Sequence, residues 1–208
     1  MKKQRTLAAF ALVSLLSGEI TMTTTASEVV VSADTSEQRA LAEWAVERYE
    51  TAGLVLPSLN IEFVGPDQIA CGGVPARTYF EETPTVKMCW NNEFMLLHEL
   101  AHVWVEQNVP PTDRDSFTAM RDDVRGWAGT EVPWSERASE HAANIIAWGL
   151  QEKPYLISRT YPNDKDSLLE AFEFLTGSEP LHDGGRDMRA VDPASLVDRP
   201  RPPLESGR

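Results

Sequence analysis

The stretch FMLLHELAHVW, residues 94–104, decides how the rest of the chain is interpreted. Apolar side chains cover nearly every side of a helix built from it, which is typical of a helix buried in a core. The same stretch holds His98, Glu99 and His102, in a chain that has only four histidines. Residues four apart share a helical face, so both imidazoles can reach one ion while Glu99 lies beside them.

Burial makes a metal ion the favoured explanation of these three side chains. The alternative is a pair of ordinary core histidines beside a helical glutamate. Burying two imidazoles and a carboxylate without partners is costly, and a shared cation removes that cost. Zinc suits the pair, because it accepts imidazole nitrogen at about 2.0–2.1 Å and leaves a position open for water. We therefore predict one Zn²⁺ ion bound by His98 and His102.

A catalytic zinc site takes three protein ligands, so a third must come from another part of the chain. The best candidate lies in SERASEHAANIIAWGL, residues 135–150, which has the pattern of a helix rich in small and apolar residues. Glu140 and Asn144 fall on one face of that helix. We predict that Glu140 is the third ligand and that Asn144 bonds a ligating histidine. Glu136 is the alternative third ligand, and a solvated helix face is the explanation without a metal.

The elements around the motif predict an α+β fold. A helical pattern precedes three short strand-like runs, and the motif helix starts at Asn91 or Asn92. Further helices follow, the first of them with Thr112 and Asp115 as a capping pair. This order predicts a small sheet of about three strands packed on the motif helix. The expected strands cover residues 59–65, 76–82 and 84–90, and the expected helices 34–53, 92–109, 112–124, 133–151 and 165–175.

The two ends of the chain differ in composition from its centre. Basic residues at positions 2, 3 and 5, an apolar run over 7–16 and a cleavage residue, Ala26, predict a signal peptide over residues 1–26. Residues 177–208 are rich in proline, glycine and charge, and are predicted to be a flexible tail. Residues 27–176 then form a single domain. We expect an exported protein without stable membrane insertion after leader removal, because the apolar run is too short to span a bilayer.

The charge balance limits the classes of partner that the protein can bind, and the two cysteines bear on the compartment in which it works. The 208 residues include 19 basic and 32 acidic side chains, and the net charge of -13 repels phosphate backbones, which argues against a nucleic-acid partner. Cys71 and Cys89 are the only cysteines. In an oxidising compartment such a pair predicts one disulfide, whereas the competing role is that one thiolate binds the metal.

Two motifs resemble those of a known family. H-E-x-x-H at 98–102, followed by E-x-x-A-N-x-x-A at 140–147, is similar to the gluzincin type of zinc metallopeptidase, and closest in motif to the small ImmA/IrrE-type domains. The likeness spans roughly residues 59–150 and implies a minimal zincin-like fold. It also implies hydrolysis of peptide bonds, with Zn²⁺ on His98, His102 and Glu140 and with Glu99 as the general base. The peptide or protein substrate stays open, because a leader and a cysteine pair are not expected of the intracellular members.

Two other functions are compatible with the first motif. A deformylase-like amidohydrolase combines H-E-x-x-H with an upstream cysteine, and Cys71 or Cys89 could take that part, but the glycine-cysteine-leucine context of that family is missing. A secreted binding module on a zincin scaffold would hold the metal without needing Glu99, so Glu99 favours catalysis.

The sequence determines less about the substrate cleft than about the metal site. The strand around Val86–Cys89 is expected to present an edge to an extended peptide. Trp134 is expected to lie in the core with most other tryptophans. The donor to the oxyanion stays open among Tyr155, Tyr161, His141 and His182, and the oligomeric state is open as well.

Overall fold

The computed structural model describes residues 27–65, 69–122, 124–129, 131–152 and 160–182, and the backbone alone of residues 19–23. Most of the predicted signal peptide, most of the predicted tail and Tyr155 lie outside these residues. Among the described residues, no helix is both long and apolar enough to cross a bilayer. The fold is α+β, as the sequence predicts.

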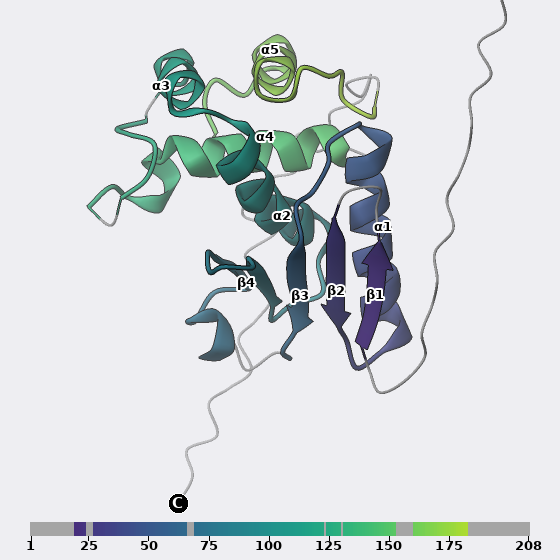
Figure 1. Cartoon of the computed structure of the whole chain (residues 1–208). Helices are drawn as coiled ribbons and strands as arrows, with labels where there is room; N and C mark the ends of the chain where they lie inside the picture. The colour runs from purple at the N-terminus through teal and green to yellow at the C-terminus, as the bar shows by residue number, and fades with distance from the viewer. Residues whose placement is uncertain are drawn as a thin grey trace, which may run out of the picture.

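A five-stranded sheet forms one layer of the fold (Figure 1). Its strand order is β1-β2-β3-β5-β4; β2, β3 and β5 are parallel, and each outer strand is antiparallel to its neighbour. The strands are β1 Glu19–Thr23, β2 Glu28–Ser32, β3 Leu59–Phe63, β4 Ala76–Tyr79 and β5 Thr85–Met88. The last three are the predicted strands, so the expectation of about three strands is two too few.

The two additional strands lie at the N-terminal side of the domain. β2 pairs with β3, and its Val29 and Val31 are fully buried. The sequence signal for β2 is weak, because three consecutive valines do not alternate with polar residues and follow closely on the leader pattern. β1 lies within residues 1–26, so removal of the predicted signal peptide would leave β2 as the outer strand.

The helix α1, Ser36–Thr51, connects β2 to β3. Thr35 and Gln38 form a capping box at its start, in which the Thr35 side chain accepts from the Gln38 backbone N–H. Near its end, the hydroxyl of the buried Tyr49 donates to the carbonyl oxygen of Leu97, 2.8 Å away. This hydrogen bond ties α1 to the helix that carries the H-E-x-x-H motif.

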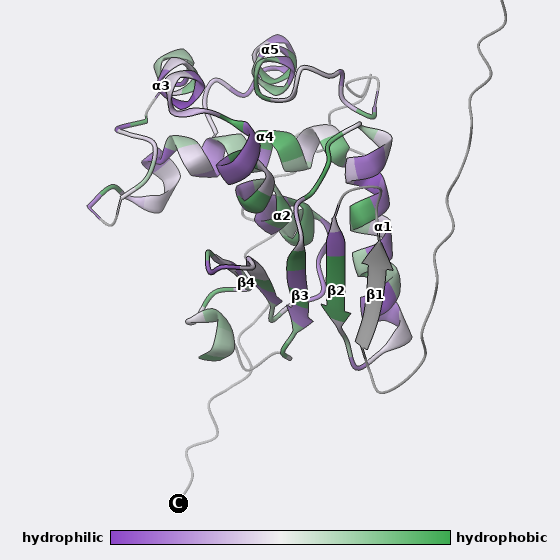
Figure 2. Cartoon of the chain, viewed as in Figure 1, coloured by the Kyte–Doolittle hydropathy of each residue, from purple (hydrophilic) through white to green (hydrophobic). Residues whose placement is uncertain are grey.

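That motif helix, α2, spans Glu93–Asn108 and is buried on nearly all sides, as predicted. Asn92 caps its start by accepting from the Met95 backbone N–H. The helix contacts β4 and β5 of the sheet, α1 beside it and α4, Ala138–Leu150, on its other side. Figure 1 shows α2 between the sheet and α4, and Figure 2 shows hydrophobic residues along both helices.

Two helix boundaries differ from the predicted ones. α3, Pro111–Met120, begins with proline at its first position, and no side chain caps it, so Thr112 and Asp115 do not form the predicted capping pair. The predicted helix over 133–151 is divided into a 3-10 turn, Trp134–Glu136, and α4. The backbone is extended at Arg137 because it pairs with the Gly126 region there. The last helix, α5, spans Lys165–Thr176 and packs on α4.

Cys71 and Cys89 form the predicted disulfide, with their Cα atoms 6.3 Å apart. It joins the 3-10 turn Ile69–Cys71, which precedes β4, to the residue that follows β5. The Cys89 backbone N–H also donates to the carbonyl oxygen of Pro75, 2.9 Å away. A disulfide and a backbone hydrogen bond therefore both hold the loop that leads into the outer strand β4.

We expect the double variant Cys71→Ala/Cys89→Ala to have a free energy of unfolding about 3 kcal/mol lower than the oxidised protein. The reason is that the cross-link constrains the unfolded chain by closing a loop of this length. Urea denaturation of the oxidised protein, the reduced protein and the variant measures the difference. Equal stability of all three would contradict this role of the cross-link.

Gly149 lets α4 and α5 approach each other closely. A Cβ atom at this position would lie 2.2 Å from two ring carbons of Phe172, which is fully buried. We expect Gly149→Ala to lower the free energy of unfolding by about 1–3 kcal/mol, the usual cost of overpacking. Gly126→Ala is the matched control, because nothing lies within 4 Å of its Cβ position. Urea denaturation measures both variants, and a Gly149→Ala variant as stable as Gly126→Ala would contradict the expectation.

Candidate metal centre

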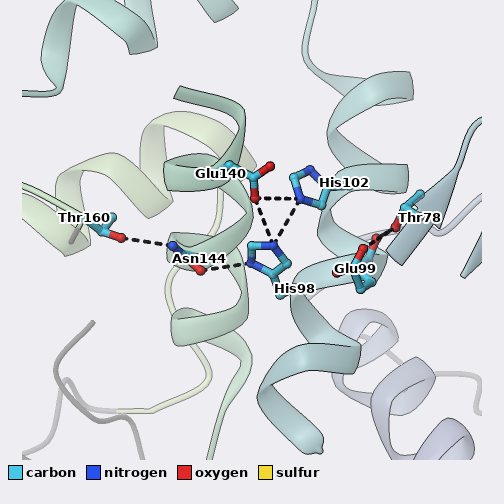
Figure 3. A network of polar contacts seen from close by, with 7 residues as sticks. All are labelled: Thr78, His98, Glu99, His102, Glu140, Asn144 and Thr160. Atoms are coloured by element: carbon cyan, nitrogen blue, oxygen red, sulfur yellow. Dashed lines mark hydrogen bonds and ion pairs between the residues drawn. The ribbon is translucent and has the colours of Figure 1, made fainter. Parts of the chain in front are cut away.

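Three predicted ligands meet where α2 crosses α4 (Figure 3). His98 and His102 come from successive turns of α2, and Glu140 comes from the first turn of α4. The two Nε2 atoms are 3.1 Å apart, and each lies 3.2 Å from Glu140 Oε2. The structure therefore brings together three side chains that could hold a metal ion, which we call the His–Glu triad.

The spacing of the triad fits a tetrahedral zinc ion. Ligands at about 2.0–2.1 Å from such an ion lie roughly 3.3–3.4 Å from one another. The three measured distances, 3.1, 3.2 and 3.2 Å, are close to this value and nearly equal. The donor set of two imidazoles and one carboxylate is also one that catalytic zinc sites use, with a fourth position left for water.

The triad lies in the protein interior, where an ionised carboxylate needs partners. Glu140 is 8% exposed. Burial raises the pKa of Glu140, but hydrogen bonds with His102 and His98 outweigh it and hold the pKa well below its usual range. For His102, burial lowers the pKa, while the bond to Glu140 and the charges of Glu140 and Glu99 raise it above the ordinary value. The site therefore favours negative charge at Glu140 and positive charge beside it.

Asn144 contacts His98, one of the two predicted histidine ligands, as its position four residues after Glu140 predicts. Its Oδ1 atom lies 2.9 Å from His98 Nδ1. A proton on Nδ1 leaves the lone pair of Nε2 free for an ion, because neutral imidazole carries one proton. The Asn144 amide nitrogen donates in turn to Thr160 Oγ1, 3.1 Å away (Figure 3). Thr160 has no recognisable signal in the sequence, because it belongs to a loop between α4 and α5.

Glu99 lies beside the triad rather than within it. The hydroxyl of Thr78, on β4, is 2.8 Å from Glu99 Oε2 and 3.0 Å from the Glu99 carbonyl oxygen, so it donates to this residue. Figure 3 shows Glu99 and Thr78 on the side of α2 that is opposite Glu140. Thr78 holds the carboxylate at the cleft, a role that the strand pattern around it did not reveal.

A cleft of about 570 Å³ opens onto the site. His98, Glu99, His102 and Glu140 all line it. Its lining also includes the segment from Val74 to Thr78, which contains most of β4, and the side chains of Trp127 and Trp134. The cleft therefore combines the triad, a separate carboxylate and an outer strand of the sheet.

The prediction that the strand around Val86–Cys89 presents an edge is wrong, because this strand, β5, lies inside the sheet. It pairs with β3 on one side and β4 on the other. Within the part of the chain that the structure describes, β4 has no strand on its outer side, and it is β4 that lines the cleft. The order of strands in the sheet is set by tertiary packing, so the sequence alone could not distinguish these two.

The structure also decides the predictions for Glu136, for the two cysteines and for Trp134. Glu136, the alternative ligand, forms an ion pair with Arg125 instead of joining the triad. Both cysteines are used in the disulfide, so neither offers a thiolate to the metal. Trp134 is not a core residue but is 48% exposed on the cleft wall.

The described candidates for the oxyanion donor do not line the cleft. Of the three that the structure describes, none lines it: His141, Tyr161 and His182. His141 contacts the carbonyl oxygen of Ser135, and His182 contacts that of Trp148. Both histidines therefore have structural partners at the ends of α4.

We expect Glu140→Gln to weaken zinc binding by more than about 100-fold, because loss of a ligand costs more than loss of a group that only orients one. Glu136→Gln is the matched control and should bind zinc like the wild type. Competition with a chromophoric chelator measures both affinities. For the wild type, affinity should fall as the pH is lowered, because zinc must then displace a proton from His102. Equal affinities of the two variants would remove Glu140 from the site.

Comparison of the chain with models of protein families, with curated proteins and with solved structures finds no match. The geometry of the triad and its cleft is therefore the basis for inferring a function.

Proposed function

We propose that this protein is an exported zinc-dependent peptidase that hydrolyses peptide bonds in extended substrates. The observation that carries the proposal is the nearly equilateral His–Glu triad, which opens onto a cleft together with a second buried carboxylate, Glu99. The motif resemblance to gluzincin metallopeptidases supports the same reaction. A disulfide is compatible with an exported protein.

His98, His102 and Glu140 are the residues that would hold Zn²⁺. When bound, zinc supplies a water of lowered pKa and polarises the substrate carbonyl. Glu99, which lines the same cleft as the triad, would accept the proton of that water and pass it to the leaving amine nitrogen. Thr78 keeps the Glu99 carboxylate turned to the cleft by donating a hydrogen bond to Oε2. Asn144 keeps the Nε2 atom of His98 unprotonated by accepting from Nδ1.

The cleft walls support a peptide as the substrate. β4 has backbone donors and acceptors on its outer side, with which an extended peptide can form main-chain hydrogen bonds. Three large apolar residues on the walls are substantially exposed to solvent: Val74, Phe80 and Trp134. Exposed apolar surface gathered in a cleft is typical of a binding site. We infer that the substrate places a large apolar side chain against these residues.

Glu99 distinguishes catalysis from simple metal binding. A structural zinc site closes its coordination with protein ligands and needs no further carboxylate. Glu99 is 6% exposed and is held by Thr78 beside the triad. Burying a carboxylate costs free energy, and a catalytic use would explain why the protein keeps one at this position.

We expect Glu99→Gln to retain about one zinc ion per chain and the wild-type fold, but to reduce peptide hydrolysis by about 10²–10⁴-fold, the usual contribution of a general base. The substrates are quenched fluorescent peptides that contain a large apolar residue. Metal content, circular dichroism and initial rates are the measurements. Glu106→Gln is the matched control, because Glu106 also lines the cleft but forms an ion pair with Arg114.

Hydrolysis by Glu99→Gln at the wild-type rate would remove Glu99 from the mechanism. A wild-type protein that binds zinc yet cleaves none of the peptides would favour the binding module instead. A wild-type protein that neither contains zinc nor takes it up would contradict the metal centre itself.

A further inference from the structure

A buried arginine holds the loop behind the His–Glu triad. Arg121, the residue that follows α3, is 6% exposed. Its Nη2 atom donates to the carbonyl oxygen of Thr160, 3.2 Å away, and to that of Pro162. A guanidinium is costly to bury, so the bonds that it makes in the interior are strongly favoured. Both go to one short segment, and Arg121 therefore fixes the backbone of residues 160–162.

The side chain of Thr160 connects this segment to a ligating histidine. Thr160 is fully buried, and its Oγ1 accepts from Asn144 Nδ2 at 3.1 Å. Asn144 Oδ1 lies 2.9 Å from His98 Nδ1 on its other side. Figure 3 shows Thr160, Asn144 and His98 in a row that ends at the triad. Because all three side chains are buried, water cannot readily replace a lost partner.

We propose that Thr160 and Arg121 are positioning residues for His98 and act on it through Asn144. The inference rests on the proposed metal centre. Thr160 accepts the Asn144 N–H and so keeps Oδ1 turned to His98. Without that acceptor the buried N–H lacks a partner, and the amide rotates to find one. Arg121 keeps the Thr160 hydroxyl within reach by holding the backbone that carries it.

The competing explanation is that Arg121 and Thr160 serve only to join α3 to the α4–α5 region. Neither residue touches the triad or lines the cleft, so stability alone does not distinguish the two roles. A purely structural clamp changes the free energy of unfolding and leaves the orientation of His98 unaltered. Zinc affinity and the hydrogen bond at His98 Nδ1 are the quantities that separate them.

The first experiment measures zinc affinity by chelator competition. We expect Thr160→Val to weaken binding about tenfold, at the low end of the effect of groups that orient metal-bound imidazoles. Thr160→Ser keeps the hydroxyl, so this variant should bind zinc with the wild-type affinity. Thr118→Val is the matched control, since its hydroxyl donates to the Arg114 carbonyl within α3. In an Asn144→Ala background, Thr160→Val should have no further effect, because the path to His98 is already broken.

The second experiment needs no metal. The NMR signal of the His98 Nδ1 proton reports whether its bond to Asn144 is intact. We expect this proton to exchange with solvent faster in Thr160→Val and in Arg121→Met than in the wild type, and at the wild-type rate in Thr118→Val. If Arg121→Met does not fold, Thr160→Val decides the result.

Wild-type zinc affinity and wild-type exchange of the His98 proton in a folded Thr160→Val variant would overturn the proposal. Additive effects of Thr160→Val and Asn144→Ala on zinc affinity would overturn it too. If the wild-type protein binds no zinc, the proposed function fails, and the exchange of the His98 proton then decides the positioning role by itself.

Discussion

The close packing of α2 against α4 is the contact on which the rest of the site depends. α4 is rich in small residues, four of which are fully buried: Ala138, Ala142, Ala143 and Ala147. Small side chains favour close packing of helices. His98 and His102 face this contact from α2, and Glu140 faces it from α4. A core made only of apolar side chains would be easier to form, so the polar groups at its centre indicate a function rather than a need for stability.

The polar groups around the triad extend in two directions from α2. On one side Thr78 holds Glu99 at the cleft, and on the other Asn144 and Thr160 connect His98 to the loop that Arg121 fixes. Such partners limit the rotation of side chains whose orientation decides whether an ion can bind. The two sides correspond to the two tasks of the proposed mechanism, proton transfer and metal binding.

The outer strand β4 lines the cleft at the His–Glu triad. Its neighbour β5 leads directly into α2, and the disulfide joins the residue after β5 to the turn before β4. The strand that lines the cleft and the helix that carries His98 and His102 are thus connected within a short length of chain. Movement of one relative to the other is restricted by a covalent bond as well as by the hydrogen bond between Thr78 and Glu99.

The amino-acid sequence by itself determined the parts of this protein that depend on local spacing. The H-E-x-x-H helix, the shared face of Glu140 and Asn144, the three strands before the motif and the cysteine pair follow from the periodicity of helices and strands and from cysteine chemistry. Tertiary structure alone decided that β4 is the outer strand, that Thr78 and Thr160 contact the site and that Trp134 lines a cleft. These depend on contacts between residues far apart in the chain, which helical or strand periodicity does not encode.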